Sequence, residues 1–230
     1  MEHFFLPSIP GDRFTVEGET YRHLTRARRM AVGDRVVFCD GRGWDYLARM
    51  TGCTREGAAF LIESRTPAQA ECAVSFHLYQ CLPKGDKMEE VLRRCTPLGV
   101  SRFIPVLSAR CVAGAPGEAK RARWEKIVRA AATQSGRSVL PEISDLCTFE
   151  QAAAEMRRAD AFFLCYENAT APLPALPERG TIAFLIGPEG GLTPQEADLL
   201  PCCSLGKRIL RCEEAAAFLM PILLDRTGNL

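Results

Sequence analysis

Apolar positions along the chain follow two different patterns, which change near residue 70. Up to that point, short apolar runs such as 36–39 and 58–63 are separated by turn residues, a pattern typical of a small β-sheet. After a polar segment broken by Pro67, strand-like runs alternate with amphipathic stretches. The order strand, helix, strand predicts a parallel sheet with right-handed crossovers. We therefore expect an α/β chain with two domains, residues 1–70 and residues 71–230.

The strongest local signals lie in residues 181–217. An almost continuous apolar run at 181–186 predicts a strand that is buried on both faces. A glycine-rich turn follows at 187–191, and residues 193–196 form a capping box with Pro194 at the first helical position. A strand, a glycine loop and a helix N-terminus together form a corner that can hold an anion or a cofactor. The glycines match neither the dinucleotide fingerprint nor the P-loop, which disfavours both of those classes.

Composition and charge exclude some classes of protein but do not identify a partner. The formal net charge of +1 does not indicate a nucleic-acid binder, so any RNA contact must come from local clusters. The 11 cysteines contain no C-x-x-C pair and the 3 histidines are scattered, so we expect buried, reduced cysteines and no metal site. The N-terminus lacks a signal-peptide region, and the longest apolar run, 215–224, is too short to cross a bilayer. We expect a soluble cytoplasmic protein with no membrane contact.

Four motifs occur in a fixed order: KGDKME at 84–89, QSGR at 134–137, IGPEGG at 186–191 and LGKRILR at 205–211. Together they resemble the family of ribosomal RNA small subunit methyltransferase E. The resemblance covers nearly the whole chain and implies methylation of N3 of a uridine in 16S ribosomal RNA, with S-adenosyl-L-methionine as methyl donor. It also implies a PUA-like β-barrel, an α/β methyltransferase domain of the SPOUT class with a trefoil knot, and a homodimer.

The resemblance places the S-adenosyl-L-methionine pocket where three strands end. The implied cofactor-binding residues are Leu164, Cys165, Ile186, Gly187, Glu189, Gly190, Leu205, Gly206, Ile209 and Leu210. Glu189 is expected either to meet the cationic end of the cofactor or only to fix the glycine loop.

The expected chemistry requires help with a proton. N3 of uracil is a poor nucleophile until its proton leaves, so the site needs a proton acceptor or a cation that stabilises the uracil anion. We predict Arg211 as that cation. Glu213 either orients Arg211 or accepts the proton; alternatively, it only complements the helix N-terminus.

Basic residues in three places are candidates for RNA contacts. Arg22, Arg26 and Arg29 have helical spacing and are expected to share one face, which either binds phosphates or is simply solvated. Lys84 and Lys87 are either RNA contacts or ordinary loop lysines. Arg137 either binds a phosphate or base edge or forms a structural ion pair.

The chain departs from the family pattern close to the predicted catalytic residues. The family usually has threonines where this chain has Cys212 and Glu214, and an arginine where it has His3. Both threonine hydroxyls are therefore missing. An alternative hypothesis is a non-catalytic RNA-binding or ribosome-assembly protein of the same fold. A third hypothesis is a SPOUT enzyme with another RNA target.

Overall fold

The computed structural model describes residues 3–6, 8–9 and 11–230, so the expected lack of an N-terminal signal peptide lies partly outside them. Contacts divide the chain into two units. The N-terminal unit comprises Met1–Glu71 together with Ala132–Leu140, and the C-terminal unit comprises Cys72–Ala131 together with Pro141–Leu230. The sequence predicted one division after residue 70, but residues 132–140 belong to the first unit.

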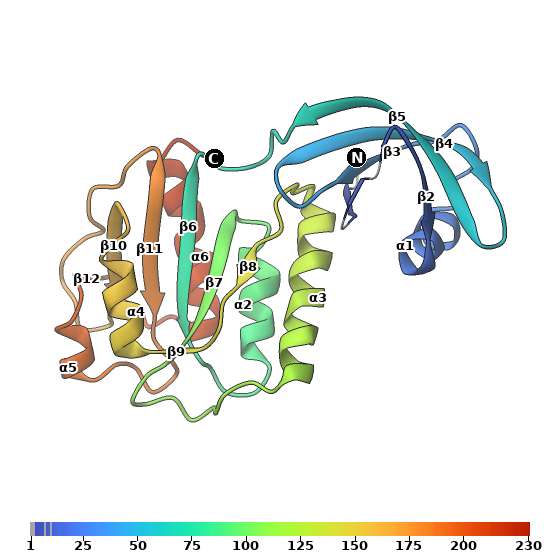
Figure 1. Cartoon of the computed structure of the whole chain (residues 1–230). Coiled ribbons are helices and arrows are strands. Elements are labelled where there is room, and N and C mark those ends of the chain that lie inside the picture. Colours follow the sequence, from blue (N-terminus) through green and yellow to red (C-terminus); the bar gives the residue numbers. More distant parts are fainter. Residues whose placement is uncertain (1–2, 7, 10) are drawn as a thin grey trace. The chain divides into compact units, whose positions relative to one another are not determined.

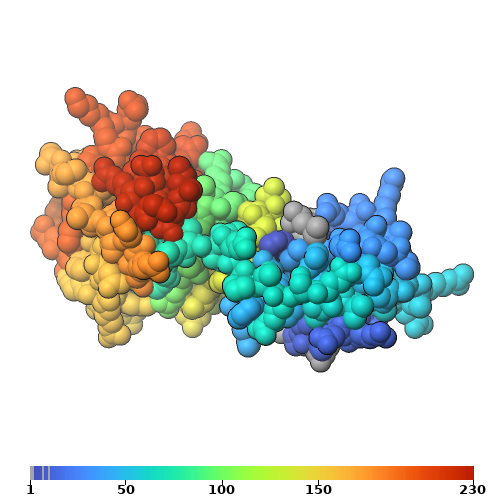
Figure 2. Space-filling model, turned by 90° about the horizontal axis from the view of Figure 1, so that it is seen from above, coloured from blue at the N-terminus to red at the C-terminus, as the bar shows by residue number. Residues whose placement is uncertain are grey.

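The N-terminal unit contains a five-stranded sheet in the order β1-β3-β4-β5-β2. The strands are β1 (His3–Phe5), β2 (Arg13–Glu17), β3 (Arg35–Cys39), β4 (Trp44–Cys53) and β5 (Gly57–Pro67). Its core is aromatic: the ring of Phe38 meets that of Phe60 edge-on, with centroids 4.9 Å apart, and that of Phe14 at 5.3 Å. Strands β4 and β5, coloured light blue to cyan, lie on the visible face of this unit in Figure 2.

The arginine-rich segment after β2 does not form the single regular helix that we expected. Helix α1 (Gly18–Arg22) continues into a π-helix, η1 (His23–Ala27), where the spacing of side chains changes. Arg29 lies after both helices with a left-handed backbone, φ 53°. Arg22, Arg26 and Arg29 are all exposed, but they do not share one regular α-helical face.

The C-terminal unit contains a parallel sheet in the order β12-β10-β11-β6-β7-β8, with β9 also paired to β7 (Figure 1). Its strands are β6 (Val74–Cys81), β7 (Val100–Leu107), β8 (Glu142–Ile143), β9 (Cys147–Thr148), β10 (Ala161–Cys165), β11 (Gly180–Ile186) and β12 (Cys202–Cys203). Its helices are α2 (Lys87–Cys95), α3 (Glu118–Ser135), which ends in the N-terminal unit, α4 (Phe149–Met156), α5 (Pro194–Ala197) and α6 (Cys212–Arg226).

Both faces of the central strands are buried, as the apolar run 181–186 predicted. Phe184 packs in one core cluster with residues of α2, α3 and α6, whereas Leu185 packs in the other cluster with residues of α4. Figure 1 shows α4 on one side of the sheet and α2 and α6 on the other. Because all the strands are parallel, their carboxyl ends meet at one edge, where ligands bind in open α/β sheets.

Candidate functional site

One cavity of about 470 Å³ opens at the carboxyl edge of the sheet in the C-terminal unit. The two glycine-bearing segments, 187–191 and 204–211, are separate in sequence and line it together. Cys165 at the end of β10 and Ile186 at the end of β11 contribute to its wall. The wall of the cavity therefore consists of two glycine-bearing loops and the ends of strands β10 and β11.

The candidate cofactor residues converge on this cavity with one exception. Lining it are Cys165, Ile186, Gly187, Glu189, Gly190, Leu205, Gly206, Ile209 and Leu210. Leu164 is the exception, because neighbouring residues of a strand point to opposite faces of the sheet. Its side chain is fully buried in the core cluster on the α4 side, so the prediction that Leu164 contacts a cofactor is corrected.

Sequence reasoning missed several residues of the wall. Tyr166 and Glu167 follow β10 directly, and Ser204 and Arg208 belong to the second loop. Arg208 lies within the LGKRILR motif but was not singled out there, and the other three residues had as their sequence signal only their position beside Cys165 or beside that motif. Lys87 is also in the wall, although the sequence suggested it as an RNA contact or an ordinary loop lysine.

The glycine loop needs its glycines for both conformation and space. Gly191 has φ 69°, and a Cβ there would lie 2.6 Å from Oε1 of Glu167. A Cβ on Gly190 would lie 3.2 Å from Cβ of Arg110, whose Nη1 donates to the Gly190 carbonyl at 3.0 Å. Side chains larger than hydrogen would therefore displace the loop or its supports.

Helix α5 fixes the far end of the glycine loop, as the capping box predicted. The hydroxyl of Thr193 accepts from the Glu196 N–H at 3.2 Å, and the Glu196 carboxylate accepts from the Thr193 N–H at 2.8 Å. The same carboxylate also accepts from the N–H of Ala109 at 2.7 Å. The capping box thus joins the loop to the segment after β7.

Lys87 connects the glycine loop to the start of α6. Its Nζ lies 2.9 Å from Oε1 of Glu189 and 3.4 Å from Oε2 of Glu213. The hydrogen bond to Glu189 raises the pKa of Lys87. Partial burial works to raise the pKa of Glu189, but the hydrogen bond from Lys87 and backbone N–H groups, including that of Lys84, hold it below its ordinary value. This contact therefore assigns Lys87 to the cavity wall.

Arg211 and Glu213 lie together at the N-terminus of α6. Arg211 is the N-cap residue, its side chain is 77% exposed, and its Nη1 lies 3.9 Å from Oε1 of Glu213. Burial works to raise the pKa of Glu213, but hydrogen bonds from its own N–H, the Cys212 thiol and Lys87 keep it lowered. Arg211 thus provides an accessible cation, and the neighbouring Glu213 is an ionised carboxylate held by Lys87 and Cys212.

The two departures from the family pattern have different surroundings. The Sγ of Cys212 donates to Oε2 of Glu213 at 3.2 Å, and burial raises the pKa of this thiol to about 12. Cys212 is therefore a protonated donor to Glu213. Glu214 is exposed and lies 3.9 Å from Nη1 of Arg94, away from the cavity lining.

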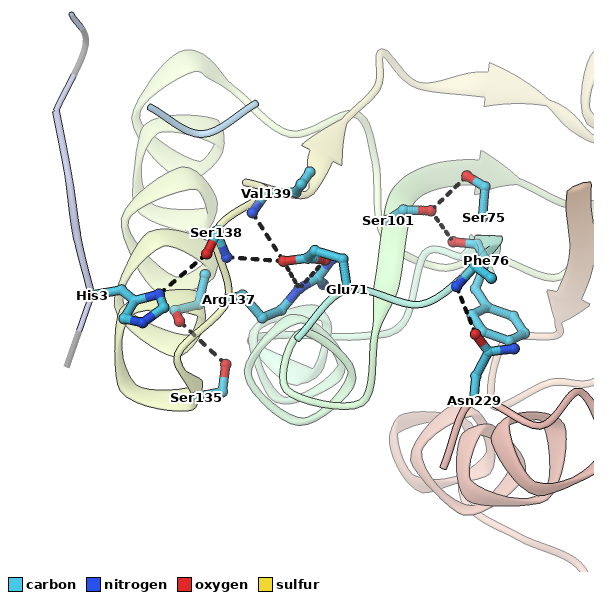
Figure 3. A network of polar contacts seen from close by, with 12 residues as sticks. His3, Glu71, Ser75, Phe76, Ser101, Ser135, Arg137, Ser138, Val139 and Asn229 are labelled. Atoms are coloured by element: carbon cyan, nitrogen blue, oxygen red, sulfur yellow. Dashed lines mark hydrogen bonds and ion pairs between the residues drawn. The ribbon is translucent and has the colours of Figure 1, made fainter. Parts of the chain in front are cut away.

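Arg137 forms a structural ion pair in the N-terminal unit (Figure 3). Its side chain is only 5% exposed, and its Nη2 and Nε donate to the Glu71 carboxylate at 2.7 and 3.2 Å. The N–H groups of Ser138 and Val139 donate to the same carboxylate, both at 2.9 Å. The prediction of an RNA contact at Arg137 is therefore corrected, because this guanidinium is buried.

Among residues 3–6, 8–9 and 11–230, no three His, Cys, Asp or Glu side chains are grouped so that they could hold a metal ion. Within the same ranges, no helix has the length and apolar character needed to cross a membrane.

The comparisons with known proteins agree with this arrangement. The family model of the RNA methyltransferase PUA domain matches residues 16–63, and that of the RNA methyltransferase domain matches residues 70–224. A PUA domain followed by this domain, with the cavity in the second unit, defines the class of RNA methyltransferases.

Similar proteins narrow the class to one family. Ribosomal RNA small subunit methyltransferase E of Bacillus subtilis (strain 168) is 30% identical, over 93% of this chain and 90% of that protein. The enzyme of the same name from Synechocystis is 34% identical, over 84% of this chain and 66% of that protein. A crystal structure of ribosomal RNA small subunit methyltransferase E from Neisseria gonorrhoeae bound to S-adenosyl methionine has a TM-score of 0.87 and 31% identity, covering 98% of this chain and 97% of that one. The chain belongs to the ribosomal RNA small subunit methyltransferase E family.

Proposed function

We propose that this chain methylates N3 of a uridine in 16S ribosomal RNA, with S-adenosyl-L-methionine as the methyl donor. The observation that carries the proposal is that both glycine-bearing segments line one shared cavity, together with Arg211. The Neisseria gonorrhoeae relative, which has the same fold, binds S-adenosyl methionine.

The residues of the cavity fit such a ligand. Its volume of about 470 Å³ lies within the range of small-molecule sites. Backbone at Gly187 and Gly190, with apolar walls at Ile186, Leu205 and Leu210, would hold the adenosyl part. The Glu167 carboxylate is available to the amino group, whereas the Glu189 carboxylate already accepts from Lys87 and from the Lys84 N–H. When bound, the cofactor supplies a methyl group activated on a sulfonium.

Arg211 supplies the electrostatic part of the reaction in this proposal. Its exposed guanidinium can stabilise the negative charge that forms on a uracil oxygen as the N3 proton leaves. The lowered pKa of Glu213 makes its carboxylate a weak proton acceptor. The contacts of Glu213 with Lys87 and Cys212 therefore favour a role in orienting Arg211.

The proposed function also includes RNA contacts, a location and an oligomeric state. Arg22, Arg26, Arg29 and Lys84 are exposed and suited to RNA phosphates. We further propose a cytoplasmic homodimer. Ile209 and Phe218 support the dimer, because these apolar side chains are 81% and 51% exposed.

We also propose that the segment from β11 to α6 carries the trefoil knot of the SPOUT class. Forced unfolding from the two termini tests this directly, because a knotted chain tightens and extends less than its full contour length. Full extension of the chain would reject the knot and leave the proposed reaction untouched. Light scattering of the purified chain tests the dimer in the same independent way.

Two experiments test the proposed reaction. Calorimetry should detect binding of S-adenosyl-L-methionine and of its demethylated product, and no binding of either would reject the enzyme. Mass spectrometry of small-subunit RNA from a deletion strain should show loss of N3-methyluridine. Binding of the cofactor without loss of this mark would instead support another RNA target. An unchanged mark with no cofactor binding would support the non-catalytic assembly protein.

A further inference from the structure

A compact aromatic and cationic group lies at the start of β4 in the N-terminal unit. Trp44 and Tyr46 are two residues apart, so their side chains lie on the same face of the strand. Arg65 of β5 pairs directly with Tyr46. The Arg65 Cζ lies 3.9 Å from the ring centroid of Trp44 and 5.4 Å from that of Tyr46. One guanidinium therefore lies over two aromatic rings.

The group is anchored on one side and accessible on the other. Tyr46 packs against the core cluster of the N-terminal unit, which fixes its position. Trp44 is half-buried and Arg65 is exposed. Because regular strands carry all three residues, the group keeps its geometry without a bound partner, which reduces the entropy lost on binding.

The charge of Arg65 distinguishes it from its neighbours on the same sheet. Arg35 and Arg49 are held by the carboxylate of Glu63, with Nε–O distances of 2.6 and 2.8 Å. Arg65 makes no ion pair with any residue that the structure describes. Among the described residues its charge faces the two rings and is not paired with a carboxylate, so an anionic or electron-rich ligand can still bind it.

We propose that Trp44, Tyr46 and Arg65 form a stacking site for an unpaired nucleobase of RNA. A guanidinium plane and aromatic rings are the groups on which proteins stack splayed-out bases. A phosphate next to that base would meet the charge of Arg65. The site differs from Arg22, Arg26 and Arg29, proposed above to meet phosphates, because it recognises the base as well as the backbone. It rests on the proposed function only in taking RNA as the partner.

The test compares two probes that have the same charged backbone and differ in whether they carry bases. One is a ten-nucleotide single-stranded RNA, and the other is an abasic ribose-phosphate oligomer of the same length. The chain has 2 tryptophans, and Trp124 is only 1% exposed, so a change in fluorescence on titration reports on Trp44. Stacking of one base predicts binding about 5- to 150-fold tighter for the RNA than for the abasic oligomer.

Variants separate stacking from charge, and their affinities are measured by calorimetry because Trp44→Leu removes the fluorescent reporter. Trp44→Leu and Arg65→Gln should bring the affinity ratio of the two probes close to one. The matched control Arg49→Gln removes a charge from the same two strands but should leave the ratio unchanged. Equal affinity of the wild-type chain for both probes would overturn the site. So would an unchanged ratio in Trp44→Leu and Arg65→Gln variants that keep the wild-type circular dichroism spectrum. Neither result would alter cofactor binding, which tests the proposed function separately.

Discussion

Replacing Glu71 by alanine should destabilise the chain strongly, because one carboxylate satisfies several buried groups. It accepts from the Arg137 guanidinium, whose side chain is 5% exposed, and from the N–H groups of Ser138 and Val139. Removing one partner of a buried ion pair costs about 3–5 kcal/mol, since the other charge loses its counter-ion. For a chain of this size, that loss lowers Tm by about 6–20 °C.

Differential scanning calorimetry of the full chain measures this shift. Glu63→Ala is the matched control, because the Glu63 carboxylate also accepts from arginine side chains, those of Arg35 and Arg49. Those side chains are 58% and 38% exposed, so water can replace the lost contacts and Tm should change far less.

The same variant distinguishes the two interpretations of Arg137. If Arg137 contacted RNA, removal of Glu71 would leave Tm nearly unchanged and would strengthen RNA binding by freeing a cation. A Glu71→Ala protein that melts within about 2 °C of the wild type, well below the shift expected for a buried pair, would refute the structural reading.

Three further predictions concern the cavity. Arg211→Ala should keep cofactor affinity in calorimetry but lower turnover about 100-fold or more in a methyl-transfer assay, and near-normal turnover would remove Arg211 from its role. Gly191→Val should abolish cofactor binding while circular dichroism stays native, because φ is 69° and the new side chain meets a carboxylate; unchanged affinity would contradict this loop geometry. The pKa values of Glu189 and Glu213 are lowered from the ordinary value of 4.5. Their ionised carboxylates therefore stabilise the folded chain fully above pH 4.5, and this stabilisation is lost as the pH falls through the lowered pKa values. Lys87→Met should therefore flatten the dependence of Tm on pH below 4.5, and an unchanged profile would exclude the ion pairs.

Features determined by neighbouring residues were predictable from the sequence. The strand β11 and the capping box of α5 followed from apolar continuity and from the spacing of Thr193 and Glu196. The sharing of one cavity by two glycine segments followed from the family resemblance, since composition and periodicity do not bring distant loops together.

Features that depend on distant partners were not predictable. Nothing near Lys87 in the sequence indicates that its ammonium meets Glu189 and Glu213. The burial of Arg137 depends on Glu71, and an exposed arginine has the same local sequence pattern as a buried one. The π-helix before Arg29 also escaped prediction, because its residues have ordinary helical composition.

The membership of Ala132–Leu140 in the N-terminal unit has a consequence for dissecting the protein. The chain passes between the two units three times, after residues 71, 131 and 140. A fragment cut at residue 70 would lack Glu71 and both amides that it binds. Studies of isolated parts therefore need a grafted or co-expressed 132–140 peptide, and the N-terminal unit cannot be exchanged between homologues as one continuous segment.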